Sequence, residues 1–257
     1  MARRRFFVDA VERGQARITG AEAHHLTRVL RVEPGQQFEI SDNHAVYLAE
    51  VESARKDLVS FSVRERIAFA GPAVRIILLA ALIRFERFEW MLEKATELGV
   101  ERVVPVIAGR SERGLDRAAG KRMTRWNRIA REASEQSRRA HLPEIGVPID
   151  FENALNIAAG YRYVLEEAEA PPILAEMPAQ PQRGELLALL VGPEGGWTDR
   201  ERQQLGRSEW RAVSLGSQIC GPKRPRSRHW RSWMRRGTKS RNPTDSSRVR
   251  DDSAELP

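Results

Sequence analysis

The sequence predicts an α/β protein in which a small β-rich domain precedes a larger domain with a largely parallel sheet. In residues 1–70, short apolar stretches alternate with turn residues, which is typical of several short strands. From residue 73 to residue 219, buried strands alternate with amphipathic helices, and this order implies parallel strands. Gly71-Pro72 is a natural boundary between the two domains. Residues 220–257 follow neither pattern, because they are rich in Arg, Ser and Pro and have no apolar periodicity.

The first domain is predicted to be a small barrel-like unit with one helix. Its apolar stretches are separated by turn material such as Glu33-Pro34-Gly35. A helix is predicted over residues 22–30 because apolar residues recur there at helical spacing. These residues are Ala23, Leu26, Val29 and Leu30. The predicted strands are residues 5–8, 37–40, 46–51 and 58–63.

The second domain is predicted to contain five strands and three helices. The helix over residues 87–98 has an apolar face and ends at Gly99, a common helix stop. A long helix covers residues 121–138, and a capping box formed by Thr198 and Glu201 begins the third. The predicted strands are residues 74–83, 103–107, 161–165, 186–191 and 212–214.

The net charge of the chain is +8, but it is concentrated at the carboxyl end. Residues 220–257 hold 11 of the 43 basic residues and 4 of the 35 acidic residues. The rest of the chain is therefore nearly neutral, and the overall charge does not indicate a nucleic-acid partner. Any RNA contact has to be predicted from local clusters of arginine.

Several classes of protein are excluded by composition. The longest apolar runs, residues 76–83 and 186–191, are too short to cross a bilayer. Only three apolar residues follow the basic amino end, so we expect no signal peptide. The single cysteine excludes an internal disulfide and a zinc site built from cysteines, and the five histidines lack ligand-like spacing. We therefore expect a cytoplasmic protein with no metal site.

The glycine-rich segment over residues 192–196 is the main candidate for a binding site. It follows a predicted strand, and ligands of parallel α/β sheets bind beyond the carboxyl ends of strands. Glycines let backbone amides approach a ligand without an intervening Cβ. The segment lacks the Lys-Ser/Thr of a phosphate-binding loop and the spacing of a dinucleotide fingerprint. Taken alone, it is also compatible with a tight connection between a strand and a helix.

Five motifs in a fixed order give the segment a more specific meaning. They are residues 93–100 (EKATELGV), 126–136 (WNRIAREASEQ), 143–145 (PEI), 190–196 (LVGPEGG) and 214–219 (SLGSQI). Together they resemble the RsmE family of ribosomal RNA uridine-N3 methyltransferases, which belongs to the SPOUT (α/β-knot) class. His24-His25-Leu26, Arg31 and Pro34-Gly35 match the PUA-like RNA-binding domain of that family. The resemblance covers about residues 3–219.

The resemblance implies an enzyme that uses S-adenosyl-L-methionine to methylate N3 of one uridine in the 16S rRNA of the small ribosomal subunit. It also implies a homodimer and a deep trefoil knot around the cofactor, a topology that is otherwise nearly absent from proteins. No metal is implied, because the sulfonium already activates the methyl group. The implied cofactor-binding residues are Val191, Gly192, Pro193, Glu194, Gly195, Gly196, Leu215, Gly216 and Ile219. The alternatives are a SPOUT methyltransferase acting on another RNA site and a catalytically inactive RNA-binding protein.

The remaining site residues are predicted from local features. Glu135, Gln136 and Arg139, near the end of the long helix, are candidates for helping uracil N3 to lose its proton, as is Arg110, which follows the strand over residues 103–107. A solvated helix end is the alternative, and Arg138 stands where the family has a small residue, often glycine. The RNA-contact candidates are Arg3, Arg4, Arg28 and Arg31, with Phe6 and Phe7 as neighbouring aromatics, together with Lys94 and Arg110. Ordinary surface charge is the alternative for these residues.

After Ile219 the chain departs from the family, which continues with Leu-Arg-x-Glu-Thr-Ala and an apolar helix that completes the knot and the dimer interface. Codons can be chosen for Cys220 to Trp233 so that adding one C before the codon of Cys220 shifts the reading frame and produces the family sequence. The shifted frame reads Leu-Arg-Ala-Glu-Thr-Ala-Ala-Ile-Ala-Ala-Leu-Ala-Val-Met. Our hypothesis is that residues 220–257 are out of frame. A disordered basic RNA-binding tail is the rival interpretation.

Overall fold

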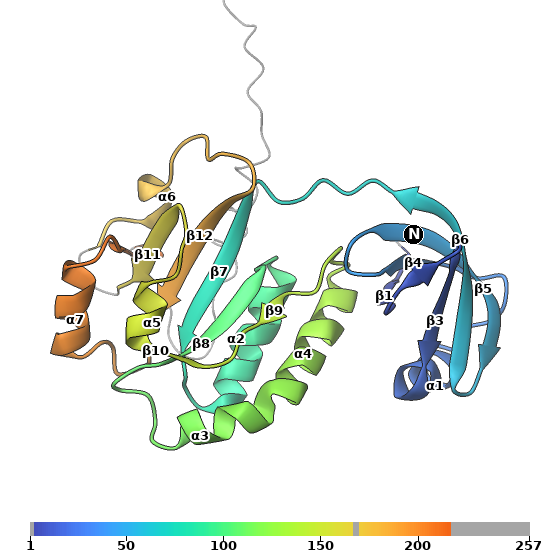
Figure 1. Cartoon of the computed structure of the whole chain (residues 1–257), viewed down its shortest axis with the longest axis horizontal. Helices are drawn as coiled ribbons and strands as arrows, with labels where there is room; N and C mark the ends of the chain where they lie inside the picture. Colours follow the sequence, from blue (N-terminus) through green and yellow to red (C-terminus); the bar gives the residue numbers. More distant parts are fainter. Residues whose placement is uncertain (1–2, 167–169, 217–257) are drawn as a thin grey trace, which may run out of the picture.

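A computed structural model describes residues 3–166 and 170–216. These residues form two sheets that share no strand (Figure 1). The first sheet has the strand order β1-β4-β5-β6-β3-β2, and α1 (Gly20–Arg28) packs against β3, β5 and β6. Its strands are β1 (Arg5–Phe7), β2 (Val11–Glu12), β3 (Gln15–Thr19), β4 (Gln37–Ser41), β5 (Val46–Arg55) and β6 (Leu58–Ile67). Only β1 and β4 pair in parallel; the other pairs are antiparallel.

The four predicted strands of this domain are confirmed, but β2 and β3 were not predicted. In β3 only Ala16 and Ile18 are buried, and polar residues flank both, so the strand contains little apolar sequence. The predicted helix was shifted by two residues. Because α1 ends at Arg28, Val29 and Leu30 lie beyond it, and the prediction that Val29 belongs to the apolar face was wrong: its side chain is 64% exposed.

The second sheet is parallel throughout, as predicted from the alternation of strands and helices. Its strand order is β10-β8-β7-β12-β11-β13, with β9 also paired to β8. Its strands are β7 (Val74–Ala81), β8 (Arg102–Ile107), β9 (Glu144–Ile145), β10 (Ile149–Asp150), β11 (Tyr161–Leu165), β12 (Glu185–Val191) and β13 (Arg211–Val213). The helices are α2 (Phe85–Glu97), α3 (Leu115–Ala119), η1 (Gly120–Arg122), α4 (Met123–Gln136), α5 (Phe151–Leu155), α6 (Ile173–Glu176) and α7 (Asp199–Gly206).

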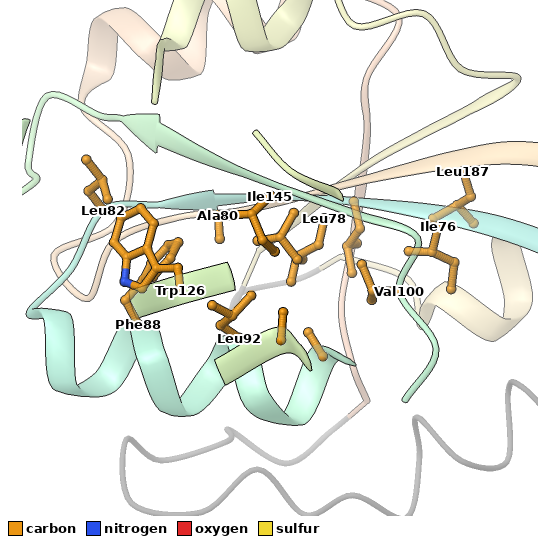
Figure 2. Packing of buried hydrophobic residues seen from close by; sticks show 14 of the residues in the cluster. Ile76, Leu78, Ala80, Leu82, Phe88, Leu92, Val100, Trp126, Ile145 and Leu187 are labelled. Carbon is orange, nitrogen blue, oxygen red and sulfur yellow. The ribbon is translucent and has the colours of Figure 1, made fainter. Parts of the chain in front are cut away.

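The central strand β7 is buried on both faces, which explains its unbroken apolar sequence. Figure 2 shows Leu78 and Ala80 of β7 above Leu92 of α2, with Phe88 and Trp126 near Leu82 at one end of the same cluster. The alternate residues of β7 belong to the core on the opposite face, which contains Phe151, Trp197 and Trp210. Helices α2 and α4 therefore cover one face of the sheet, and α5 and α7 cover the other.

The elements that the sequence did not predict in this domain are short. They are α3, η1, β9, β10, α5 and α6, each of two to five residues. A helix of three to five residues does not complete one apolar repeat, and a strand of two residues shows no alternation, so periodicity cannot reveal either. Within residues 3–166 and 170–216, no helix is long and apolar enough to cross a membrane.

The carboxyl end of α4 joins the two sheets (Figure 1). Glu39 of β4 accepts hydrogen bonds from Arg5 at 2.7 Å and from Arg138 at 2.6 Å. Arg5 also donates to the Arg138 carbonyl at 2.7 Å. Farther along, the buried Ser41 hydroxyl donates to the Ala140 carbonyl at 2.6 Å. We call this set, Arg5, Glu39, Ser41, Arg138 and Ala140, the domain joint.

Candidate functional site

The glycine-rich loop over residues 192–196 leaves the carboxyl end of β12, between β7 and β11. Trp197 is buried beneath it, and a Cβ at Gly192 would lie only 3.0 Å from the indole ring. Gly196 donates to the Pro193 carbonyl at 2.8 Å and has a φ of +67°, which L side chains rarely adopt. The loop therefore favours glycine at residue 192 because space is tight and at residue 196 because of the backbone conformation.

The helix that follows the loop begins with the predicted capping box, which is confirmed. The Thr198 hydroxyl accepts from the Glu201 amide at 3.2 Å, and the Thr198 amide donates to the Glu201 carboxylate at 2.7 Å. Glu201 is 5% exposed, and its second oxygen accepts from the Gly109 amide at 2.7 Å. The cap of α7 is thus also a contact with the loop that follows β8.

Three neighbouring segments contact the glycine-rich loop or the start of α7. Arg87, in α2, forms an ion pair with Glu194. Arg110, which follows β8, donates to the Gly195 carbonyl at 2.7 Å. Arg202 of α7 lies 3.3 Å from the Glu166 carboxylate, which follows β11. Side chains that follow β7, β8 and β11 therefore meet at the carboxyl end of β12.

The second predicted binding segment lies at the same edge of the sheet. It follows β13, which pairs with β11, and Ser214 donates to the Pro171 carbonyl at 2.8 Å. Gly216 has a φ of +120°, again a glycine conformation. The structure thus places both segments, residues 191–196 and 214–216, at the carboxyl ends of the strands. Ile219, the last predicted cofactor residue, lies outside the described residues.

Two of the catalytic candidates, Arg139 and Gln136, lie near the amino ends of the strands, opposite the glycine-rich loop. Arg139 donates to the Thr96 carbonyl at 2.7 Å, near the end of α2. This helix returns from the carboxyl end of β7, and the chain beyond it reaches the start of β7, where Glu101 donates to the Ile76 carbonyl. Gln136 is exposed at the end of α4. Within one chain, the structure therefore does not bring Arg139 and Gln136 to the glycine-rich loop. Burial lowers the pKa of Arg139 to about 10, which still leaves it cationic at neutral pH.

Glu135 lies between the two domains. Arg131 donates to the Phe7 carbonyl at 2.7 Å and pairs with Glu22 of α1 at 3.0 Å, and its Nε lies 3.7 Å from Glu135. Burial and the nearby Glu22 carboxylate raise the pKa of Glu135 to about 7, although Arg131 opposes this shift. Its Oε1 is buried and has no hydrogen-bond partner among the described residues. These contacts favour a role in the packing of the domains.

We expect Glu135→Gln to stabilise the protein above pH 7. A carboxyl group with a raised pKa contributes stability that is fully present below its ordinary pKa, near 4.5, and is lost as the pH rises through about 7. The Gln side chain does not ionise, so the free energy of unfolding of the variant should exceed that of the parent by on the order of 2 kcal/mol at pH 8 and by little at pH 5. Urea unfolding at both pH values measures the difference. Glu132→Gln, at an exposed position of α4, is the control and should show no such pH dependence; equal behaviour of the two variants would contradict the prediction.

The structure changes the meaning of the predicted RNA-contact residues. Phe6 and Phe7 are 4% and 1% exposed, so the prediction that they supply aromatic surface beside the arginines was wrong. Arg3, Arg4, Arg28 and Arg31 are exposed. Lys94 pairs with Glu93 and Glu97, both at 2.7 Å, which favours the alternative of a solvated helix face.

Arg87, Gly109 and Glu201 are site residues that the sequence did not single out. A Cβ at Gly109 would lie 2.9 Å from the Thr198 methyl group, so glycine is required there by space alone. The capping pattern identified Glu201 as a helix-start residue but contained no signal for its contact with a segment 92 residues away. Among the described residues, no three His, Cys, Asp or Glu side chains gather as a metal site.

Comparison with known proteins defines the class. The family model of an RNA methyltransferase domain matches residues 71–220, and that of an RNA methyltransferase PUA domain matches residues 18–64. The chain therefore has the two domains of an RNA methyltransferase with an attached PUA domain.

Individual relatives give the particular family. Ribosomal RNA small subunit methyltransferase E of Bacillus subtilis is 31% identical over 212 residues, which cover 79% of this chain and 82% of the relative. The solved structure of the same enzyme from Neisseria gonorrhoeae, bound to S-adenosyl methionine, is 26% identical with a TM-score of 0.76, covering 86% of this chain and 93% of that one. A probable rRNA methyltransferase from Porphyromonas gingivalis is 27% identical with a TM-score of 0.72, covering 91% and 98%. The chain belongs to the family of ribosomal RNA small subunit methyltransferase E.

Proposed function

We propose that the gene encodes an enzyme that transfers a methyl group from S-adenosyl-L-methionine to N3 of a specific uridine in 16S rRNA, in the cytoplasm. The supporting observation is that two glycine-containing segments, residues 191–196 and 214–216, lie together at the carboxyl ends of strands in the second sheet. A related structure that carries S-adenosyl methionine supports the choice of cofactor. In this proposal, residues 1–70 bind RNA and residues 73–219 carry the methyltransferase site.

The residues of these two segments fit this cofactor. Gly195 is exposed and Gly192 and Gly196 are half-buried, and none has a Cβ that would cover the backbone amides. In our proposal, backbone groups of residues 191–196 and 214–216, with Ile219, hold the cofactor, whose sulfonium supplies an electrophilic methyl group. The protein then has to orient the uracil in line with that methyl group and accept the N3 proton.

We further propose that the active enzyme is a knotted homodimer. Arg139 and Gln136 lie at the amino ends of the strands, whereas the glycine-rich loop lies at the carboxyl ends. If these side chains act in catalysis, a second copy of the chain has to bring them to the loop. Residues 220–257, which stand where the family has its knot-completing helix, are in our proposal the product of a shifted reading frame.

The proposal is tested by incubating the purified chain, with its reading frame restored before the codon of Cys220, with small ribosomal subunits and S-adenosylmethionine labelled in the methyl group. We expect label in 16S rRNA, and mass spectrometry of the digested RNA should identify 3-methyluridine. Label on another nucleotide would favour a SPOUT enzyme with a different RNA site. A chain with the restored reading frame that binds RNA but transfers no label would favour the inactive RNA-binding protein.

A further inference from the structure

Arg110 contacts the glycine-rich loop through both its guanidinium group and its aliphatic carbons. The guanidinium donates to the Gly195 carbonyl at 2.7 Å. Its Cδ lies 3.5 Å from the point where a Cβ at Gly195 would stand, so the side chain follows the backbone of the loop at van der Waals distance. A charged donor paired with a carbonyl forms one of the stronger hydrogen bonds in proteins. The contact joins two segments that are 85 residues apart.

The residue before Arg110 is fixed to the other end of the same loop. The Gly109 amide donates to Glu201 at 2.7 Å, and the second oxygen of this carboxylate accepts from both the amide and the hydroxyl of Thr198 at 2.7 Å. The carboxylate is buried, so leaving its oxygens without these donors would be costly. Gly109 and Arg110 are adjacent, and together they hold the loop at Gly195 and at Thr198.

We infer that Arg110 and Glu201 are positioning residues that fix the backbone of residues 192–198 in the conformation required for cofactor binding. The inference rests on the proposed function, because it assigns this loop to the cofactor. It gives Arg110 a role in the cofactor loop in place of the predicted contact with RNA. Both side chains act through the loop, and their own contacts are with protein backbone and with Thr198.

Hydrogen–deuterium exchange of the full chain tests the inference without requiring methyl transfer. Removing the bond to the Gly195 carbonyl should let the loop open more often, so Arg110→Ala should exchange about tenfold faster in a peptide covering residues 192–198. Arg110→Lys keeps the charge but not the planar donor group, and should exchange almost as fast as Arg110→Ala. Glu201→Gln should have a similar effect, because an amide has one acceptor oxygen for donors on two segments. Arg113→Ala, which removes an exposed arginine from the same connection, is the control and should leave the exchange unchanged.

Binding to a 16S rRNA transcript at increasing salt separates the two roles of Arg110. A positioning residue should leave the salt dependence of RNA binding unchanged in Arg110→Ala. Unchanged exchange of residues 192–198, with a salt slope lower by about 0.7 as expected for one lost phosphate contact, would overturn the inference. A chain with the restored reading frame that binds no S-adenosylmethionine would count against the proposed function, yet the exchange comparison would still decide whether Arg110 and Glu201 fix the loop.

Discussion

Restoring one base before the codon of Cys220 is expected to raise the affinity for S-adenosylmethionine about a hundredfold or more, a change of about 3 kcal/mol. In our proposal, the restored segment would complete the knot, cover the cofactor and form the dimer interface. The written chain, which is the chain with the sequence as given, has instead a polar, basic sequence after Ile219, and this sequence lacks the apolar residues that an interface helix would bury. Isothermal titration of the written and restored chains measures the difference, and size-exclusion chromatography should show a dimer only for the restored chain.

A chain that ends at residue 219 is the matched control, because it lacks both carboxyl-terminal sequences. It should bind the cofactor as poorly as the written chain, which would show that the restored helix supplies the affinity. Resequencing the gene across codons 219 and 220 decides whether the base is present in the genome. Equal cofactor affinity of the written and restored chains would contradict the hypothesis of a shifted frame.

The fold was predictable wherever an element was long enough to show a complete pattern. The buried strand β7 and the amphipathic helix α2 are each longer than one apolar repeat, and both were predicted within two residues of their bounds. Strand β3 was not predicted, because two buried apolar residues among polar ones do not distinguish a strand from a loop. Helix α1 was shifted because Val29 fits a helical pattern that the backbone does not continue.

The site was predictable in part, because loops carry local signals but contacts between loops do not. The glycines of residues 192–196 predicted a loop with an unusual backbone conformation, and the structure gives physical reasons for Gly192 and Gly196. The contact of Glu201 with Gly109 depends on the sheet order, which places the ends of β8 and β12 near each other with β7 between them. No spacing in the sequence encodes that order. Residue 138 is a related case: Arg138 has a φ of +55°, a left-handed conformation that favours glycine.

Glu39→Ala is expected to destabilise the chain by about 3–5 kcal/mol, because it removes one partner of a buried ion pair. The side chains of Arg5 and Glu39 are only 8% and 12% exposed, so Arg5 would remain charged in a buried position. Arg138 would also lose the partner that accompanies its left-handed backbone. Burial opposes ionisation of Glu39, but the hydrogen bonds from Arg138 and Arg5 outweigh it and lower the pKa. This contribution is therefore present above the ordinary pKa, near 4.5, and is lost as the pH falls through the lowered value.

Glu50→Ala is the matched control, since Glu50 lies on the neighbouring strand and pairs at 3.1 Å with Arg64, whose side chain is 52% exposed against 8% for Arg5. An exposed pair contributes little, so this variant should lose less than about 1 kcal/mol. Urea unfolding at pH 7 measures both variants, and Glu39→Gln, which keeps the shape of the side chain, should fall between them. If Glu39→Ala and Glu50→Ala unfold at the same urea concentration, the domain joint does not stabilise the protein, and its arginines are solvated well enough without Glu39.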